Sequence, residues 1–244
     1  MALVTGAGRG LGAEMAVALG GAGAEVLVMS RTASDLDQVA ARIAAAGGRA
    51  KALVCDVKDG SQLRAKIGRL DRLDVLVNNA GMNVPEPFVD VSEAHLDEQL
   101  ALNVRAAFLV AQTAVRKMLE APDRRERGGA VINVSSQMGH VGSAGRTVYC
   151  MAKHAIEGLT KAMAVELAPH NIRVNAIGPT FIETPMTAPF FANPEFREWA
   201  TSRIPLGRIG KMEEVAGAVV FLASQAASLI TGASLVIDGG WTAQ

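Results

Sequence analysis

The stretch "ALVTGAGRGLG", residues 2–12, decides the fold, because a short apolar run leads directly into a glycine-rich turn. The apolar run predicts a strand, and the residues after the turn predict a helix. Between them Gly6, Gly10 and Gly12 follow the spacing G-x-x-x-G-x-G. A glycine turn that opens a helix is typical of dinucleotide-binding folds, in which free N–H groups at the helix N-terminus bind the pyrophosphate.

The same strand-then-helix unit recurs along the chain. Strands are predicted over residues 2–6, 25–30, 50–57, 73–81, 130–136, 172–179 and 233–240. Helices are predicted over residues 11–23 and 33–48, and near 59–70, 92–120, 147–168 and 212–224. The strands are runs of Val, Ile and Leu, which is typical of strands covered on both faces. The sequence therefore predicts the α/β class: a doubly wound parallel sheet, or Rossmann fold, of about seven strands with helices on both faces.

Two segments interrupt this alternation. The charged stretch "PDRRERGG", residues 122–129, is predicted to be a solvated connection. Residues 180–204 contain three prolines and the run "PFF", which predicts an insertion that acts as a flap over a substrate site. Because no linker, repeat or low-complexity tract divides the chain, residues 1–244 are expected to form a single dinucleotide-binding and catalytic domain.

The composition narrows the class of protein. Half of the 244 residues are apolar and a fifth are charged, which is typical of a globular chain. The 24 basic residues balance the 24 acidic ones, so no excess charge predicts a nucleic-acid or membrane partner. We expect neither a spanning helix nor a secretory signal, and therefore a cytoplasmic location. Cys55 and Cys150 are predicted to be buried reduced thiols, and the four scattered histidines predict no metal site.

The end of the second predicted strand bears on the choice of cofactor. Dinucleotide folds that bind NAD usually place an acid there, against the ribose 2′-hydroxyl. Residues 29–32 contain no acid; Ser30 and Arg31 end the strand, and Arg9 lies in the glycine turn. A hydroxyl and two guanidinium groups suit a 2′-phosphate, so NADP(H) is expected to be preferred. The alternative is NAD(H), with Arg31 as a solvated surface residue.

Tyr149 is the only tyrosine in the chain, and Lys153 follows it by four residues. At about 3.6 residues per turn the two side chains share one face of the predicted helix. A free phenol has a pKa of about 10, and a neighbouring ammonium is expected to lower it toward the range useful for acid–base catalysis. Ser136 ends a predicted strand, where its hydroxyl can stabilise charge on a substrate oxygen. The alternative is a packed tyrosine and a serine that merely ends a strand.

Six motifs occur in order along nearly the whole chain. They are "TGAGRGLG" (5–12), "NNAG" (78–81), Asn103 in "LALNV", "NVSS" (133–136), the Y-x-x-x-K of Tyr149 and Lys153, and "RVNAIGP" (173–179). In these motifs the chain resembles the short-chain dehydrogenase/reductase family. The resemblance implies hydride transfer between a nicotinamide cofactor and a secondary alcohol or ketone, with Tyr149 as general acid or base. It also implies that Lys153 contacts the nicotinamide ribose and that Asn103 holds a water in a proton relay to the lysine.

The resemblance also implies the cofactor contacts. Asp56 resembles the acid that accepts a hydrogen bond from the adenine amino group, with Val57 beside it. The full set of expected cofactor-binding residues is Gly6, Arg9, Gly10, Leu11, Gly12, Ser30, Arg31, Asp56, Val57, Asn79, Ala80, Gly81, Tyr149, Lys153, Ile182 and Thr184. The family usually has proline and glycine where this chain has Pro179 and Thr180. Because a β-branched residue disfavours positive φ, the turn beside the nicotinamide is expected to be shaped differently.

The expected substrate follows from the tail of the chain, which resembles gluconate-type and polyol dehydrogenases. A polyol, a sugar acid or another small carbonyl compound is therefore expected, and Arg146 and His140 are the polar candidates to bind it near Tyr149. One alternative is a 3-oxoacyl thioester reductase. The other is a non-catalytic dinucleotide-binding sensor, a class that typically loses the tyrosine or the lysine. The long helices at 92–120 and 147–168 are apolar on more than one face, and family members are commonly tetramers, so a homotetramer is expected.

Overall fold

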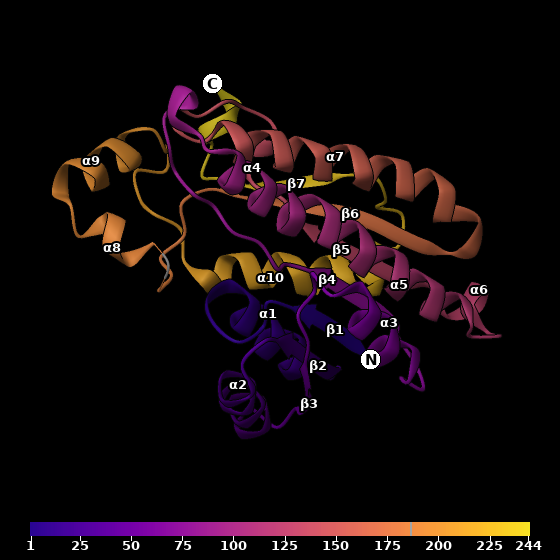
Figure 1. Cartoon of the computed structure of the whole chain (residues 1–244). Coiled ribbons are helices and arrows are strands. Elements are labelled where there is room, and N and C mark those ends of the chain that lie inside the picture. Colours follow the sequence, from indigo (N-terminus) through magenta and orange to yellow (C-terminus); the bar gives the residue numbers. More distant parts are fainter. Residues whose placement is uncertain (186) are drawn as a thin grey trace.

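The computed structural model describes residues 1–185 and 187–244 and contains a seven-stranded sheet (Figure 1). The strands are β1 (Ala2–Thr5), β2 (Glu25–Ser30), β3 (Arg49–Val54), β4 (Val75–Asn78), β5 (Gly129–Val134), β6 (Ile172–Pro179) and β7 (Ser234–Ile237). They lie in the order β3-β2-β1-β4-β5-β6-β7, and all neighbouring pairs are parallel. The order reverses between β1 and β4. This is the predicted doubly wound sheet, so the fold class is confirmed.

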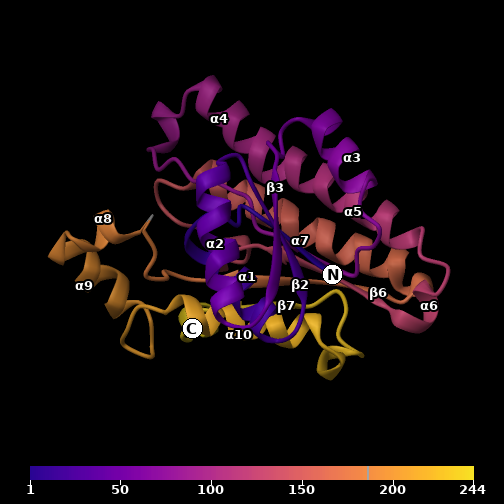
Figure 2. The ribbon, with the colours of Figure 1, turned by 90° about the horizontal axis from the view of Figure 1, so that it is seen from below.

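Helices cover both faces of the sheet (Figures 1 and 2). One face packs against α1 (Gly10–Gly21), α2 (Ala33–Ala45) and α10 (Met212–Ala223). The other packs against α3 (Gly60–Gly68), α5 (Ala107–Leu119) and α7 (Thr147–Leu167). Leu3 and Val4 are both fully buried but belong to different clusters, because successive residues of a strand point to opposite faces.

Shorter elements complete the chain. They are α4 (Glu93–Leu100), α6 (Arg124–Arg127), α8 (Ala188–Phe191) and α9 (Pro194–Ser202), the 3₁₀ turns η1 (Phe88–Asp90), η3 (Gln137–Gly139), η4 (Ala168–His170), η5 (Gln225–Ala227) and η6 (Trp241–Ala243), and a π-helical turn, η2 (Ala101–Ala106). Among the described helices, none has both the length and the apolar character that crossing a membrane requires.

The expectation that every strand is covered on both faces is wrong for β3. This strand lies at the edge of the sheet, and most of its residues are exposed. Lys51 pairs with Glu25 of β2 across a distance of 2.9 Å on its open face. Charged side chains at a sheet edge also discourage pairing with another strand.

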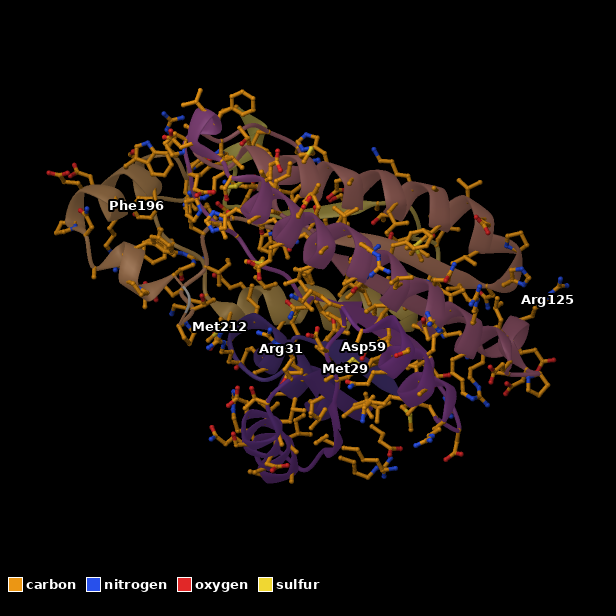
Figure 3. The ribbon with its side chains drawn as sticks, in the orientation of Figure 1. Met29, Arg31, Asp59, Arg125, Phe196 and Met212 are labelled. Carbon is orange, nitrogen blue, oxygen red and sulfur yellow. The ribbon has the colours of Figure 1, made fainter. Side chains whose placement is uncertain are left out.

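The predicted solvated connection at 122–129 is also partly wrong. It forms α6, in which Arg124 is only 4% exposed. The Arg124 guanidinium donates to the carbonyl oxygens of Leu73 and Met118, each at 2.8 Å, and to that of Gly128. Its neighbour Arg125 does project into solvent at the end of the molecule far from Phe196 (Figure 3). One of five consecutive charged residues therefore ties three chain segments together.

Both cysteines are free thiols, as expected. Cys55 is 1% exposed, but Cys150 is only partly buried, which corrects the expectation for that residue. The buried stripe of α7 includes Val148, Ala152 and Ile156, and a residue two positions from Val148 falls outside this stripe.

Candidate active site

The turn after β1 has a backbone that requires glycine. Gly6 has a φ of +63°, and a Cβ there would lie 2.9 Å from Asn79 Nδ2. A Cβ at Gly12 would overlap the carbonyl oxygen of Gly6, so glycine lets α1 pack directly on the turn. Gly10 has a φ of +57°, and apart from its chain neighbours and its own helix backbone no atom of the described residues lies within 4 Å of its Cβ position. The turn therefore combines close packing at Gly6 and Gly12 with open access at Gly10.

The first turn of α1 is suited to an anion. Arg9, the N-cap residue, makes no capping hydrogen bond with its side chain, and the first turn contains no acid. The N–H groups of Gly10, Leu11 and Gly12 have no acceptor within the helix, because they belong to its first turn. The helix dipole favours negative charge at the same place. These residues fit the pyrophosphate of a dinucleotide.

Asn79 and Ala80 are tied to the end of β1. Thr5 Oγ1 accepts hydrogen bonds from the N–H groups of Asn79, at 3.0 Å, and Ala80, at 3.1 Å. Asn79 Nδ2 donates in turn to the carbonyl oxygen of Thr5, at 2.8 Å. The structure thus places Gly6, Asn79 and Ala80 together where the strand order reverses, which is where open α/β sheets bind ligands.

The residues expected at the adenosine end lie at the ends of β2 and β3. A Cβ at Gly8 would lie 2.9 Å from Ser30 Oγ, so the glycine turn passes directly over Ser30. The Ser30 carbonyl accepts a hydrogen bond from the Cys55 N–H at 2.8 Å, which places Asp56 and Val57 at the same edge. Val57 is 7% exposed. The structure therefore brings Ser30, Asp56 and Val57 to one corner of the sheet.

Two arginines and one carboxylate belong to this corner. Arg9, in the glycine turn, and Arg31, directly after Ser30 in the chain, are both exposed. Asp35 in the first turn of α2 lies nearby, since a Cβ at Gly8 would be 3.1 Å from Asp35 Cβ. An acid opposes a 2′-phosphate here, whereas two guanidinium groups attract it. Sequence reasoning missed Asp35, because the residue lies beyond the end of the strand and reaches the corner only through the start of α2.

The predicted serine, tyrosine and lysine meet at the end of β5. Lys153 is 5% exposed; its Nζ donates to the Val134 carbonyl at 2.8 Å and lies 5.3 Å from the centroid of the Tyr149 ring. Ser136 is 7% exposed, and its Oγ donates a long hydrogen bond of 3.4 Å to the Pro179 carbonyl. The helical spacing of Tyr149 and Lys153 and the position of Ser136 thus produce one cluster.

Asn103 joins this cluster from the π-helical turn η2. Its side chain is 2% exposed and makes two hydrogen bonds with the backbone of Met82: Oδ1 accepts at 2.9 Å and Nδ2 donates at 2.8 Å. A Cβ at Gly81 would lie 3.0 Å from Asn103 Oδ1 and 3.8 Å from Lys153 Nζ. The sequence predicts a continuous helix here; the wider turn lets Asn103 face Gly81 and Lys153.

Comparison with known proteins agrees with this geometry. Residues 6–242 match the family model described as enoyl-(acyl carrier protein) reductase. The chain is 38% identical over 242 residues to an L-xylulose reductase of Bos taurus, with 99% of this chain and 96% of the relative covered. The chain belongs to the short-chain dehydrogenase/reductase family. It is therefore an oxidoreductase that acts on CH–OH groups, as expected.

Two further relatives are sugar-acid dehydrogenases by name. A gluconate 5-dehydrogenase of Gluconobacter oxydans (strain 621H) is 36% identical over 245 residues, with 99% of this chain and 94% of the relative covered. A solved gluconate 5-dehydrogenase from Burkholderia cenocepacia J2315, in complex with NADP and tartrate, is 32% identical. It superimposes with a TM-score of 0.93 and covers 100% of this chain and 95% of its own.

The electrostatics of this short-chain dehydrogenase/reductase differ from the expectation in one respect. Burial raises the pKa of Tyr149 to about 12, although the hydrogen bond with Ser136 opposes this shift. Burial lowers the pKa of Lys153 to about 8, against the opposing charge of Glu157. The expectation that the ammonium brings the pKa of Tyr149 below its ordinary value is therefore wrong for the protein alone. The cost of burying a phenolate exceeds the opposing effects of the Ser136 hydrogen bond and the Arg146 charge.

The segment after β6, residues 180–184, differs from the other predicted cofactor contacts in how much of each side chain is accessible. Ile182 is 3% exposed and packs into the core beside α10, so only its backbone is available to a cofactor. Thr184 Oγ1 lies 3.1 Å from Thr187 Oγ1. Thr180 does not have positive φ; among described non-glycine residues only Asn171 does. The turn at Thr180 thus avoids the conformation that glycine would allow.

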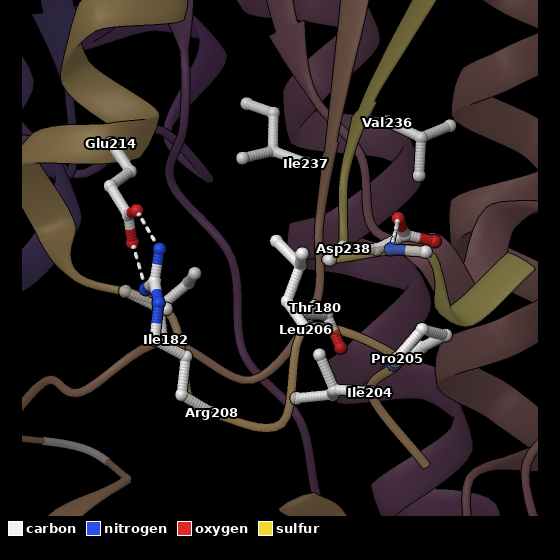
Figure 4. A pocket seen from close by; sticks show the side chains of 13 residues that line it. Thr180, Ile182, Ile204, Pro205, Leu206, Arg208, Glu214, Val236, Ile237 and Asp238 are labelled. Carbon is white, nitrogen blue, oxygen red and sulfur yellow. Dashed lines mark hydrogen bonds and ion pairs between the residues drawn. The ribbon is translucent and has the colours of Figure 1, made fainter.

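A cavity of about 500 Å³ lies behind this segment (Figure 4). Thr180 and Ile182 line it, together with Arg208 and Glu214, which form a bidentate ion pair at 2.6 and 2.9 Å. Among the described residues that line the cavity, none is one of the four predicted catalytic residues. The cavity is therefore separate from the Ser136, Tyr149 and Lys153 cluster.

Two buried polar residues next to this cluster were missed by sequence reasoning. Gln137 follows Ser136, is 1% exposed, and its Oε1 has no hydrogen-bond partner among the described residues. Glu157 is 6% exposed on α7. A signal for Glu157 was present, because it continues the four-residue spacing of Tyr149 and Lys153 along one helix face.

Proposed function

We propose that this enzyme transfers a hydride between NADP(H) and the secondary alcohol or ketone of a sugar acid or polyol. The observation that carries the proposal is the meeting of Ser136, Tyr149 and Lys153 at the end of β5, on the sheet edge that also holds the glycine turn. The names of the relatives support the substrate class. In this proposal residues 1–244 act as one dinucleotide-binding and catalytic domain.

The described residues suit NADP in particular. The N–H groups of Gly10, Leu11 and Gly12 would hold the pyrophosphate, and Ser30, Arg31 and Arg9 would hold the 2′-phosphate. The remaining proposed contacts are Gly6, Asp56, Val57, Asn79, Ala80, Gly81, Tyr149, Lys153, Ile182 and Thr184. The NADP in the gluconate 5-dehydrogenase complex supports this choice over NAD. When bound, the nicotinamide supplies or accepts the hydride.

The catalytic residues have distinct roles in the proposed mechanism. With a pKa of about 12, Tyr149 carries its proton at neutral pH and donates it to the carbonyl oxygen during reduction. Ser136 turns its O–H from the distant Pro179 carbonyl to the substrate oxygen and stabilises the developing charge. Lys153 supplies positive charge beside the phenol ring, and Asn103 holds the Gly81–Met82 backbone next to Lys153.

Arg146 favours a sugar acid over a neutral polyol. It is the N-cap residue of α7, three positions before Tyr149, and among the described residues its guanidinium donates only to the neighbouring Gly145 carbonyl, at 3.2 Å. Burial lowers the pKa of Arg146, and the charges that act on it are those of Tyr149 and Cys150, not of an acid. A partly buried guanidinium without a carboxylate partner suits a carboxylate on the substrate. The other candidate, His140, is already engaged by Ser234.

A substrate panel tests the proposal. Purified protein is mixed with NADPH or NADH and with keto-aldonates, neutral ketoses or a 3-oxoacyl thioester, and loss of reduced-nicotinamide absorbance is followed. We expect the highest kcat/KM with a keto-aldonate and NADPH. Arg146→Met should raise the KM for the keto-aldonate at least about tenfold, the value of one charge-assisted hydrogen bond, and leave a neutral ketose unaffected. A preference for the thioester would replace the proposed substrate class.

Tyr149→Phe tests the mechanism separately. The variant keeps the ring and removes the proton that the carbonyl oxygen receives. We expect kcat to fall by about two to four orders of magnitude, with NADPH binding retained. Turnover that survives this substitution contradicts the proposed role of Tyr149.

The segment 180–204 is proposed to cover the substrate. Phe191 of α8 lies 5.9 Å from Phe196 of α9 between ring centroids. Phe181 lies 5.6 Å from Phe196 and 5.7 Å from Trp241. These contacts join the segment to the C-terminal turn η6, which follows β7. The proposed flap is therefore a packed unit with its own small core rather than an extended loop.

A further inference from the structure

Glu157 is a buried carboxylate that the proposed reaction does not use. It is 6% exposed on α7, four residues after Lys153 and eight after Tyr149, so the three side chains line one face of the helix. A buried charge is costly unless partners compensate it. The partners of Glu157 therefore indicate why an acid occupies this position.

Glu157 joins three elements of the fold. Ser234 of β7 donates a hydrogen bond from its hydroxyl to Glu157 Oε1 at 3.1 Å. His140, directly after η3, places Nε2 3.4 Å from the same oxygen and 3.0 Å from Ser234 Oγ. Helix α7, strand β7 and the turn that starts at Ser136 are thus connected through one carboxylate.

The turn between Ser136 and His140 lies directly against α7. A Cβ at Gly139 would lie 3.1 Å from both Glu157 Cγ and the Lys153 carbonyl oxygen. Ser136 caps the start of this turn by accepting a hydrogen bond from the Met138 N–H at 3.1 Å. One end of the turn therefore carries the proposed catalytic hydroxyl, and the other end is anchored at Glu157.

We propose that Glu157 is a positioning residue, which fixes the Ser136 turn against α7 through His140 and Ser234 and places a negative charge one helical turn from Lys153. This inference rests on the proposed roles of Ser136 and Lys153. It assigns Glu157 no contact with substrate or cofactor.

The surroundings of Lys153 make Glu157 the relevant acid. On α7 and its N-cap, the titratable groups Arg146, Tyr149 and Cys150 precede the lysine. The others, His154, Lys161 and Glu166, are exposed. The facing elements present His140 from the turn and the neutral groups Asn103, Ser135, Ser234 and the Val134 carbonyl. Among the charges of the described residues, that of Glu157 opposes the effect of burial on the pKa of Lys153.

The first test measures the lysine directly. Protein labelled with ¹³C at lysine Cε is titrated by NMR, and Lys153→Met assigns the resonance. Glu157→Gln keeps the shape and an acceptor for Ser234 but removes the charge, so we expect the pKa of Lys153 to fall by about one unit. Glu166→Gln, an exposed position on the same helix, should leave it unchanged. An unchanged titration in Glu157→Gln overturns the inference.

The second test follows catalysis. In Glu157→Gln the pH profile of kcat/KM should move to lower pH by the amount seen in the titration. His140→Ala leaves α7 intact but releases the end of the turn, so kcat should fall at least about tenfold, with His140→Gln partly restoring it and NADPH affinity unchanged. A change in KM alone, or in thermal stability alone, would assign these residues a purely structural role. An inactive wild-type enzyme would count against the proposed function, while the lysine titration would still decide the electrostatic role of Glu157.

Discussion

At the scale of single residues, Tyr149 and Lys153 show how burial shifts two pKa values in opposite directions. Burial raises the pKa of the phenol to about 12 and lowers the pKa of the ammonium to about 8. Both groups are protonated at neutral pH, so the pair carries one positive charge. Groups whose pKa values are driven apart by their surroundings are typical of acid–base sites.

The lowered pKa of Lys153 predicts a pH-dependent stability. Its folded pKa of about 8 lies below the ordinary 10.5, so between these values the unfolded chain binds more protons than the folded one. Stability due to this group therefore rises with pH across that window, and its burial penalty is fully present at lower pH. Relative to Lys153→Met, wild type should gain about 2–3 kcal/mol between pH 7 and pH 10. Urea unfolding across this range measures it, and a constant difference would contradict the prediction.

The corner at Ser30 predicts how cofactor preference responds to charge. Arg31→Ala removes one guanidinium from the 2′-phosphate position, so the KM for NADPH should rise about tenfold or more while that for NADH stays constant. Asp35→Asn removes the opposing carboxylate and should lower the KM for NADPH by a few-fold. Steady-state kinetics with both cofactors provide the comparison. A parallel rise for NADPH and NADH in Arg31→Ala would assign that residue a structural role.

Residues related by local spacing could be predicted from the sequence, and those related only through tertiary contacts could not. Helical spacing alone puts Tyr149 and Lys153 on one helix face, whatever the helix packs against, and the structure places them as expected. Asp35 enters the Ser30 corner through the packing of the glycine turn on α2. The role of Glu157 could not be predicted, because its hydrogen-bond partner Ser234 lies on β7, 77 residues away in the sequence.

At the scale of elements, α6 predicts different effects for neighbouring arginines. Arg124→Met removes the donor for three carbonyl oxygens and leaves the buried Leu73 and Met118 carbonyls without it. We expect the free energy of unfolding to fall by about 2–3 kcal/mol. Arg125→Met, next to it and exposed, should change stability by less than about 0.5 kcal/mol. Chemical denaturation of both variants measures the contrast, and equal effects would show that burial of Arg124 contributes nothing.

Element types were predictable where the hydrophobic pattern was strong. The bounds of β2 and β6 agree with the predicted strands, because apolar residues dominate both segments and most of their residues are buried. The π-helical turn η2 was not predictable, since its widening accompanies the hydrogen bonds of Asn103 to Met82 rather than any local preference. The helix α6 was not predicted for a related reason. A run of charged residues is usually a solvated loop, and the sequence does not show that buried carbonyl groups need Arg124 as their donor.

At the scale of the whole molecule, the strand order explains why distant motifs form one site. The parallel crossovers bring the carboxyl ends of β1, β4, β5 and β6 to one edge of the sheet. The glycine turn follows β1, Asn79 follows β4 and Ser136 follows β5. The sequence pattern predicted the sheet and the motifs separately. Their convergence depends on the strand order, which the pattern of apolar runs does not contain.

The outer faces of α5 and α7 predict an assembly. Phe108 is 47% exposed, Met151 49% and Val165 80%, although a helix at a water-facing surface should present polar residues there. We expect the protein to sediment as a homotetramer, at about four times the 25.4 kDa of one chain. Val165→Glu places a charge in the apolar contact and should shift the population to smaller species. Val89→Glu, at an equally exposed valine (86%) outside these two helices, should not. Monomeric wild-type protein at micromolar concentration would contradict the prediction, because apolar faces of this kind would then be stable in water.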